Sequence, residues 1–149
     1  MTDWGDITQA IGIALGGDEH GGREALQACW AGTADGDHAQ RCILAHYLAD
    51  LQSSLDDEVA WDETALSEHA HVVDEDLAPV GMTSAAALAP SLHLNLGDGY
   101  LRQGRVGDAS TQATAGMRAG SMLPTDGYGA FIRAGLQRLQ DRVRDAEYR

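Results

Sequence analysis

The sequence contains no lysine, so all ten of its basic residues are arginines. The phosphate-binding loop of many nucleotide-binding proteins needs a lysine directly after its last glycine. That motif is therefore absent, although glycine is frequent and gathers at Gly16-Gly17 and Gly21-Gly22. We assign these glycines to turns rather than to a phosphate site.

Cysteine is scarce as well, because only Cys29 and Cys42 occur and they form no C-x-x-C pair. In a chain without a secretory signal, two distant cysteines are more often buried thiols than a disulfide. The H-E-x-x-H motif is also missing, and the densest histidine pair, His69 and His71, would point in different directions from a helix. The sequence therefore predicts neither a metal site nor a cofactor.

No apolar stretch approaches the roughly 18 residues that a membrane-spanning helix requires. The first residues, Met1-Thr2-Asp3-Trp4, lack the basic and apolar regions of a secretory signal. The G-x-S-x-G motif of serine hydrolases is absent too. We therefore expect a single-domain cytoplasmic protein with no membrane partner, and no catalytic motif favours an enzyme.

Acidic residues, in contrast, are abundant, because 23 Asp and Glu side chains against ten arginines give a net charge of −13. Residues 1–101 carry 18 acids against Arg23 and Arg41 alone, whereas residues 102–149 carry eight arginines against five acids. A predominantly acidic chain repels a phosphate backbone, which argues against a nucleic-acid partner. The acidic composition instead favours a basic partner.

Apolar residues recur at helical spacing throughout the chain, and no stretch alternates as a strand would. A fifth helix either starts at Thr83 or Ser84 and bends at Pro90, or starts later with Pro90 in its first turn. We predict an all-α domain over residues 1–149, made of three antiparallel helical hairpins and a capping helix. The hairpins span about 3–33, 38–73 and 84–121, and the capping helix spans about 126–146. Within them we expect helices at 3–15, 21–33, 38–52, 56–73, 106–120 and 128–146, and a fifth helix that ends at residue 103.

One segment carries a repeat pattern: Leu96-Gly97-x-x-Tyr100-x-x-x-Gly104-x-x-x-x-Ala109. It resembles the tetratricopeptide repeat, in which the glycine lets two helices approach closely and the alanine packs against it. The group with the nearest likeness is the small tetratricopeptide-like proteins common in actinobacteria. The resemblance implies three stacked hairpins, of which the first two are degenerate, followed by a polar-faced capping helix.

In tetratricopeptide arrays the first helix of each hairpin lines a concave groove, and the resemblance implies that ligands bind there. His46 and Asp50 are four residues apart, so the carboxylate can accept a hydrogen bond from the ring. This pairing prepares a general base, and it equally satisfies a structural histidine. The resemblance places the following residues in the groove: Cys42, His46, Asp50, Asn95, Asp98, Leu101 and Arg102.

The start of the last helix is unusual because it combines glycines with Tyr128 and Phe131. Tyr128 and Arg133 would close one end of the groove in one interpretation. In the other, Asp126 caps the helix, the aromatic side chains lie in the core and Arg133 is solvated.

Three functional hypotheses follow from these features. The first is a helical-repeat binding module that presents a mostly acidic groove to a peptide or protein partner. The alternative is a small-molecule enzyme or ligand carrier with a pocket near His46, Asp50, Asp98 and Arg102. The third is a homo-oligomer in which the acidic residues 56–76 of one copy meet the arginine-rich last helix of another.

Overall fold

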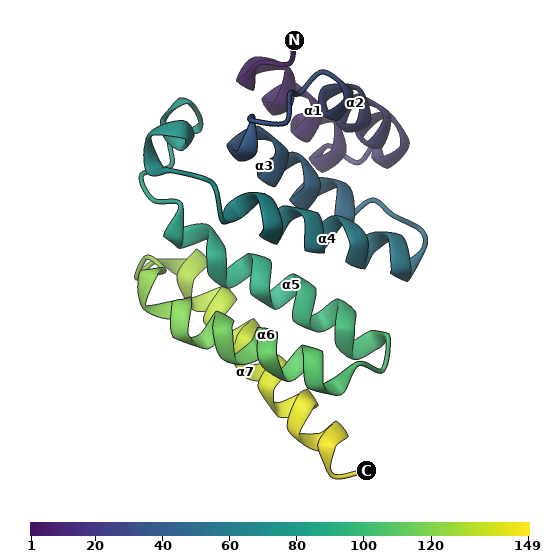
Figure 1. Ribbon diagram of the computed structural model, residues 1–149, viewed down its shortest axis with the longest axis vertical. Coiled ribbons are helices and arrows are strands. Elements are labelled where there is room, and N and C mark those ends of the chain that lie inside the picture. The colour runs from purple at the N-terminus through teal and green to yellow at the C-terminus, as the bar shows by residue number, and fades with distance from the viewer. The chain divides into compact units, whose positions relative to one another are not determined.

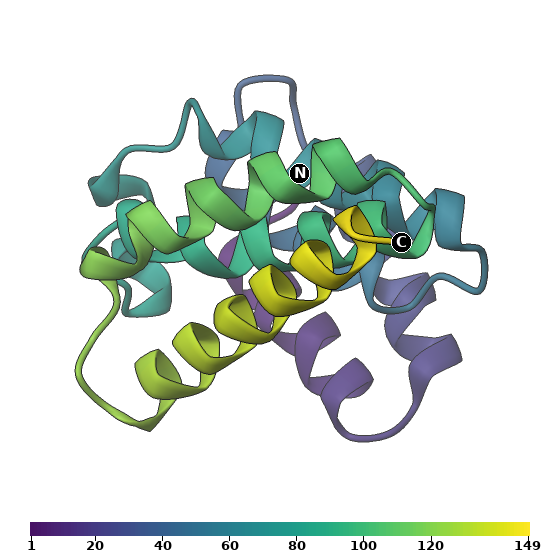
Figure 2. The same cartoon turned by 90° about the horizontal axis from the view of Figure 1, so that it is seen from below.

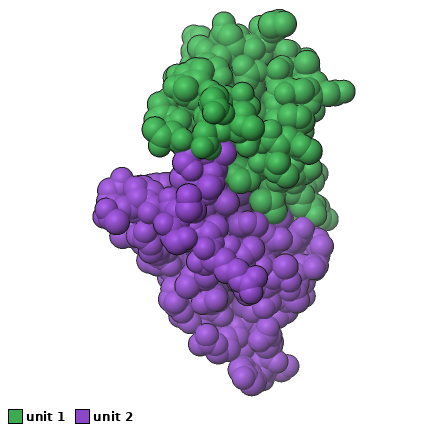
Figure 3. Space-filling view, turned by 60° about the vertical axis from the view of Figure 1, so that its left-hand side comes forward, with its two compact units in different colours: residues 1–83 green, residues 84–149 purple.

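The computed structural model describes all 149 residues and contains helices but no strand, which confirms the all-α prediction. Two compact units make up the chain, residues 1–83 and residues 84–149, and Figure 3 shows them in different colours. A single domain over the whole chain stays a prediction. No helix is both long enough and apolar enough to cross a membrane.

The first unit consists of four α-helices and one 3₁₀ helix (Figure 1). Helix α1 packs against α2, α3 packs against α4, and α2 also contacts α3. Short connections join the members of each pair, so consecutive helices lie side by side. The elements are α1 (Trp4–Leu15), α2 (Glu19–Ala31), α3 (His38–Ala49), α4 (Leu55–His69) and the 3₁₀ helix η1 (Asp74–Val80).

Side-chain caps fix where the first helices begin. The Asp3 carboxylate accepts a hydrogen bond from the Asp6 N–H at 2.8 Å, and the Asp6 carboxylate accepts one from the Asp3 N–H at 3.0 Å. The Asp18 carboxylate accepts from the Gly21 N–H at 2.9 Å, so α2 begins two residues before its predicted start. Residues 74–83 lie outside the predicted helices, and the structure places η1 within this segment.

Helices α1 and α2 approach closely at one point. A Cβ atom built on Gly22 would lie 2.5 Å from the Cβ of Ala14 and 2.6 Å from its Cα, so only glycine fits. The turn between the helices uses Gly17 with φ of +103°, a left-handed conformation that favours glycine, as the sequence indicated. Ile7 of α1 is fully buried, whereas the side chain of Leu15, the last residue of this helix, is 73% exposed.

The second unit contains three α-helices and two 3₁₀ turns. Helix α5 packs along α6, and α7 contacts both while running obliquely across them (Figure 2). A small apolar cluster of Leu123, Ile132 and Leu136 joins the start of α7 to Leu94 of α5. The elements are η2 (Ala86–Leu88), α5 (Ala89–Arg102), α6 (Val106–Ala119), η3 (Gly120–Met122) and α7 (Gly127–Glu147).

Helix α5 starts later than Thr83 or Ser84, so the second of the two alternatives is confirmed. Pro90 lies in the first turn, where its missing N–H leaves no hydrogen bond unmade. The residue before the helix, Leu88, provides no side-chain cap, so neither Thr83 nor Ser84 begins α5. Gly104 lies in the turn between α5 and α6 with φ of +80°, as its position after α5 predicted.

Gly97 lies where α5 meets its neighbours. A Cβ atom there would come within 2.7 Å of Leu139 Cδ2 on α7 and 3.2 Å of Gln112 Cβ on α6. Ala109 and Ala113 on α6 are both buried. The small side chains therefore permit close helix packing in this unit, which agrees with the physical role that the sequence pattern gave them.

Candidate functional site

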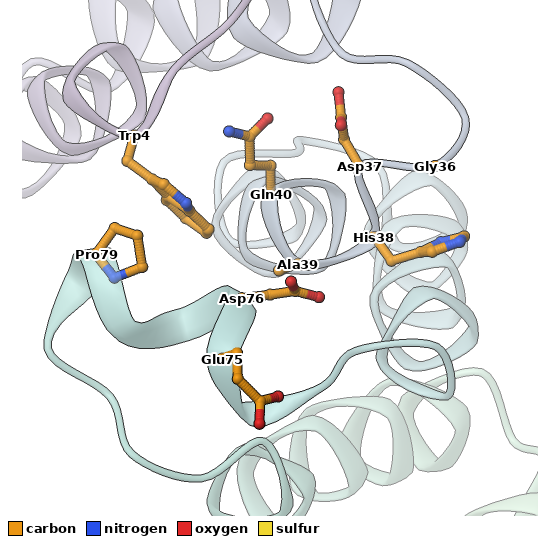
Figure 4. A pocket seen from close by; sticks show the side chains of 9 residues that line it. All are labelled: Trp4, Gly36, Asp37, His38, Ala39, Gln40, Glu75, Asp76 and Pro79. Atoms are coloured by element: carbon orange, nitrogen blue, oxygen red, sulfur yellow. The ribbon is translucent and has the colours of Figure 1, made fainter.

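A pocket of about 340 Å³ opens at the N-terminal end of α3 in the first unit. Its walls come from the first residue of α1, the loop and first turn of α3, and η1 (Figure 4). Three carboxylates, an indole ring, an imidazole ring and one amide line it. We call it the α3 pocket; its lining residues are Trp4, Gly36, Asp37, His38, Ala39, Gln40, Glu75, Asp76 and Pro79.

Two of the carboxylates, Glu75 and Asp76, belong to η1. The residue that follows them, Leu77, is fully buried and anchors this short helix in the core. Gly81 then ends the helix with φ of +76°, a conformation that favours glycine. The carboxylates are therefore carried by a mostly exposed segment that one buried side chain anchors at the pocket wall.

The start of α3 supplies the third carboxylate and a set of uncapped amides. Asp37 occupies the N-cap position, but its carboxylate accepts a hydrogen bond from the Ala34 N–H at 2.8 Å instead of capping the helix. No side chain caps α3, so the first-turn N–H groups of Ala39 and Gln40 keep their donor capacity beside the pocket. The pocket thus offers backbone donors as well as carboxylate acceptors.

No arginine neutralises the carboxylates of the α3 pocket. The His38 Nδ1–H donates to Glu68 Oε2 at 2.6 Å, its ring stacks on His71 with centroids 4.7 Å apart, and its side chain points away from Trp4 (Figure 4). Arg41, one turn further along α3, lies 4.6 Å above the Trp30 ring and 3.7 Å from Glu68. His38 and Arg41 therefore interact with other partners and do not neutralise the carboxylates of the α3 pocket.

Gln40 adds an unsatisfied acceptor to this site. Its Oε1 atom is buried and has no hydrogen-bond partner. In Figure 4 the amide lies between Trp4 and Asp37. A buried acceptor without a donor costs about 1–3 kcal/mol, so a rotation of the Gln40 side chain toward an N–H donor in the pocket would be favourable.

The side chains that line the α3 pocket suit the binding of a polar group. Nowhere in the structure do three His, Cys, Asp or Glu side chains converge as a metal site requires. Carboxylates, an aromatic face and an unpaired carbonyl oxygen are the groups that recognise a cation bearing N–H donors. The α3 pocket is therefore suited to a basic group.

The groove residues predicted on α3 differ strongly in accessibility. Cys42 is fully buried and so offers no surface to a partner, which corrects its placement in the groove. Burial raises the pKa of the Cys42 thiol to about 12, and the nearby Glu68 carboxylate adds to this rise. The thiol is therefore protonated at neutral pH and belongs to the core.

His46 and Asp50 influence each other electrostatically, and the hydrogen bond that their spacing allows stays a prediction. Burial lowers the pKa of the half-buried His46 ring, and the Asp50 carboxylate acts against that change. Asp50 itself follows the end of α3 and is exposed as a residue, yet packing around its carboxyl raises the pKa. His46 is therefore neutral at pH 7, a state that suits a hydrogen-bond acceptor.

The predicted groove residues of the second unit centre on Asp98. Its carboxylate accepts a hydrogen bond from Arg102 Nε at 2.9 Å and another from Arg142 Nη1 on α7 at 2.8 Å. Arg142 was not anticipated from the sequence. It also lines, with Leu101, a hollow of about 280 Å³ near the end of the chain. Asn95 is half-buried on α5.

Asp98 therefore has its charge compensated within its own unit, and it is a weak candidate for contact with a basic ligand. The predicted groove takes residues from both units, since Cys42, His46 and Asp50 belong to the first and the rest to the second. The joint groove stays a prediction.

The predicted end of the groove lies at the start of α7. The Asp126 carboxylate accepts from the Gly129 N–H at 3.0 Å, so the predicted cap is confirmed. Arg133 donates to the Leu123 carbonyl at 3.2 Å and thereby holds the preceding loop. Tyr128 and Phe131 are 50% and 67% exposed, so the expectation of core aromatics is wrong. Closure of the groove by Tyr128 stays a prediction.

Sequence reasoning missed the α3 pocket because its parts are far apart in the chain. Trp4 lies in the first predicted helix, 3–15, whereas Glu75 and Asp76 lie outside every predicted helix. One signal was present: an acidic run beside Pro79 and Gly81 in an otherwise helical chain. Nothing in it indicated that the segment folds back beside the start of α3.

Comparison with known proteins gave no further guide, because no family model, curated protein or solved structure matches the chain.

Proposed function

We propose that this chain is a helical-repeat binding module of tetratricopeptide type that binds a basic peptide or a basic protein segment on its acidic first unit. The observation that carries the proposal is the charge of that unit. Residues 1–83 hold 17 Asp and Glu side chains against two arginines, and three of these carboxylates line the α3 pocket without a compensating arginine. Such a surface attracts a polycation and repels a nucleic acid.

Helix packing supports the repeat part of the proposal. Consecutive helices pair as α1 with α2, α3 with α4, and α5 with α6. Gly22 and Gly97 each lie where a neighbouring helix leaves no room for a side chain. Arrays of such pairs bind extended peptides in most of their known roles.

The proposal is tested with a synthetic polybasic peptide in which arginine and lysine alternate with serine. Fluorescence anisotropy of the labelled peptide should show saturable binding that weakens strongly between about 50 and 500 mM NaCl, because salt screens the attraction. A peptide of the same design with glutamate in place of the basic residues should not bind. Equal binding of both peptides, or no binding of either, would refute the proposal.

Charge-neutralising variants locate the surface. Glu75→Gln combined with Asp76→Asn should weaken binding about fivefold, since two carboxylates of the α3 pocket lose their charge. Glu19→Gln combined with Glu24→Gln removes the same number of charges from α2, outside the pocket. This matched control should weaken binding by less than about twofold.

The alternative, a small-molecule enzyme or carrier with a site at His46, Asp50, Asp98 and Arg102, has one observation in its favour. The neutral His46 ring next to Asp50 is a proton acceptor that a reaction or a ligand could use. If this alternative holds, His46→Gln should abolish uptake of the small molecule, whereas the Glu75→Gln and Asp76→Asn pair should leave it unchanged.

A further inference from the structure

We propose that the α3 pocket binds the side chain of one arginine in the partner, in preference to a lysine. This inference rests on the proposed function, because it assigns a specific residue type to a site on the acidic unit. It follows from four features of the pocket that together fit a guanidinium better than an ammonium group.

The first feature is the Trp4 ring. Trp4 is half-buried and forms one wall of the pocket, with Pro79 nearby (Figure 4). A guanidinium is flat and weakly hydrated, so it stacks on an aromatic face more readily than a lysine ammonium does. The chain makes such contacts itself, with Arg41 lying 4.6 Å above the Trp30 ring and Arg105 lying 4.0 Å above the Tyr100 ring.

The second feature is the pair of carboxylates on η1. Glu75 and Asp76 make no side-chain hydrogen bond or ion pair in the structure and are held beside the pocket by the buried Leu77. A guanidinium presents five N–H donors in a rigid plane, enough to serve more than one carboxylate at once. A lysine offers three donors on a compact charge.

The third feature is the buried Gln40 Oε1, which lacks a donor. Gln40 lines the pocket, so a rotation of its side chain would bring this oxygen to a bound guanidinium, whose N–H can supply the missing hydrogen bond. This acceptor separates the site from a simple cluster of acids, because it requires a donor and not only a positive charge.

The fourth feature is the uncapped start of α3. The N–H groups of Ala39 and Gln40 adjoin the pocket, and the helix end carries a partial positive charge of about half a unit. The attraction of a cation to three carboxylates is stronger than its repulsion by this partial charge. The free N–H groups can donate to a main-chain carbonyl of the partner, which favours an arginine within a peptide over a free guanidinium ion.

The test uses three short peptides that differ only at the central residue of a glycine and serine background: arginine, lysine or citrulline. Citrulline is a neutral isostere of arginine. Binding is followed through the indole N–H signal of Trp4 in ¹⁵N NMR spectra of the full chain. We expect the arginine peptide to bind about threefold more tightly than the lysine peptide and at least about tenfold more tightly than the citrulline peptide.

Two variants should remove this preference, Trp4→Leu by loss of the aromatic face and Asp76→Asn by loss of a carboxylate. Because Trp4→Leu lacks the indole signal, binding to the variants and to the wild type is compared by fluorescence anisotropy of the labelled peptides. Asp76 is exposed, so the second variant keeps the test valid if the first fails to fold by circular dichroism. Tyr128→Leu removes an exposed aromatic from the other unit and should leave the preference unchanged.

The outcomes separate the two proposals. If the polybasic peptide binds with the expected salt dependence but arginine and lysine peptides bind equally, this inference is wrong and the proposed function stands. An arginine preference that survives both pocket variants also overturns the inference, because the arginine then binds elsewhere. If no basic peptide binds at all, the proposed function fails and this inference fails with it.

Discussion

Cys42 and His46 lie one helical turn apart on α3. Burial shifts the pKa of both side chains in the direction that favours the neutral form. The pKa of the Cys42 thiol is raised to about 12, and the pKa of the His46 imidazole is lowered against the opposing effect of Asp50. Both shifts have the same origin, because a charge loses its hydration when the surrounding helix packs. The two residues differ in what remains accessible, since only His46 keeps part of its surface exposed.

The Cys42 thiol should react very slowly while the protein is folded. At pH 8 a pKa of about 12 leaves a thiolate fraction on the order of a thousandfold below that of an ordinary cysteine, and burial further limits access. We expect iodoacetamide to label Cys42 only after unfolding in urea, as measured by mass spectrometry of the tryptic peptide. Rapid labelling in native buffer would contradict the buried position.

The lowered pKa of His46 predicts a pH dependence of stability. A folded-state pKa below the ordinary value means that the unfolded state binds more protons, so the stabilisation is complete above about pH 6.5 and is lost as the pH falls below it. The free energy of unfolding in urea should therefore fall between pH 7.5 and 5.5, by at most about 1.4 kcal/mol per pH unit from this group.

His46→Gln should flatten that dependence, and His20→Gln, which changes an exposed histidine on α2, should not. The raised pKa of Asp50 acts in the opposite sense and at lower pH, nearer to the ordinary range of a carboxyl group. An identical pH profile for the wild type and His46→Gln would contradict the assignment.

At the scale of the elements, close packing of paired helices depends on glycine at particular positions. Gly22 on α2 faces the Ala14 backbone of α1, whereas a Cβ atom added at Gly12 on α1 would have no neighbour within 4 Å. Both glycines lie in the interior of a helix, and they differ in whether neighbouring atoms fill the space that an added Cβ atom would need. They form a matched pair for testing the α1 and α2 contact.

Gly22→Ala should destabilise the protein by about 2 kcal/mol, because the added methyl group would meet rigid backbone atoms. Gly12→Ala should instead stabilise it by about 0.5–1 kcal/mol, since alanine loses less conformational entropy in a helix. Urea denaturation followed by circular dichroism measures both. If Gly22→Ala instead stabilised the protein, α1 and α2 would have to lie further apart than the structure shows, where an added Cβ at Gly22 comes within 2.5 Å of the Ala14 Cβ.

Across the whole molecule, charge is distributed unequally between the two units. Residues 84–149 hold eight arginines against six acids, whereas residues 1–83 hold two against 17. An excess of one sign within a compact unit costs free energy through self-repulsion, and dissolved ions reduce that cost. The same excess is what would attract a basic partner.

Raising NaCl from about 20 to 500 mM should therefore raise the melting temperature by about 2–4 °C, through relief of repulsion of roughly 1 kcal/mol. Near pH 4.5, where the sequence isoelectric point lies, the same change in salt should have a smaller effect because the net charge is close to zero. A melting temperature that falls with salt at pH 7.5 would indicate that favourable ion pairs outweigh the repulsion.

The sequence by itself determined the helical class and most helix positions. Periodic apolar residues, the caps at Asp3 and Asp126 and the turn glycines Gly17 and Gly104 are local signals, so each acts within a few residues. Pro90 restricted the start of α5 to two alternatives, and helix sterics selected the later one. The all-α prediction was correct for this reason.

Only the tertiary structure decided which polar side chains meet. Asp98 pairs with Arg142, 44 residues later, and Trp4 joins Glu75 and Asp76 in one pocket across about half the chain. Burial of Cys42 and exposure of Phe131 likewise depend on what packs against each helix face, which helical spacing does not specify. Contacts between distant residues follow from the folding of the connections, and no local pattern in this chain encodes them.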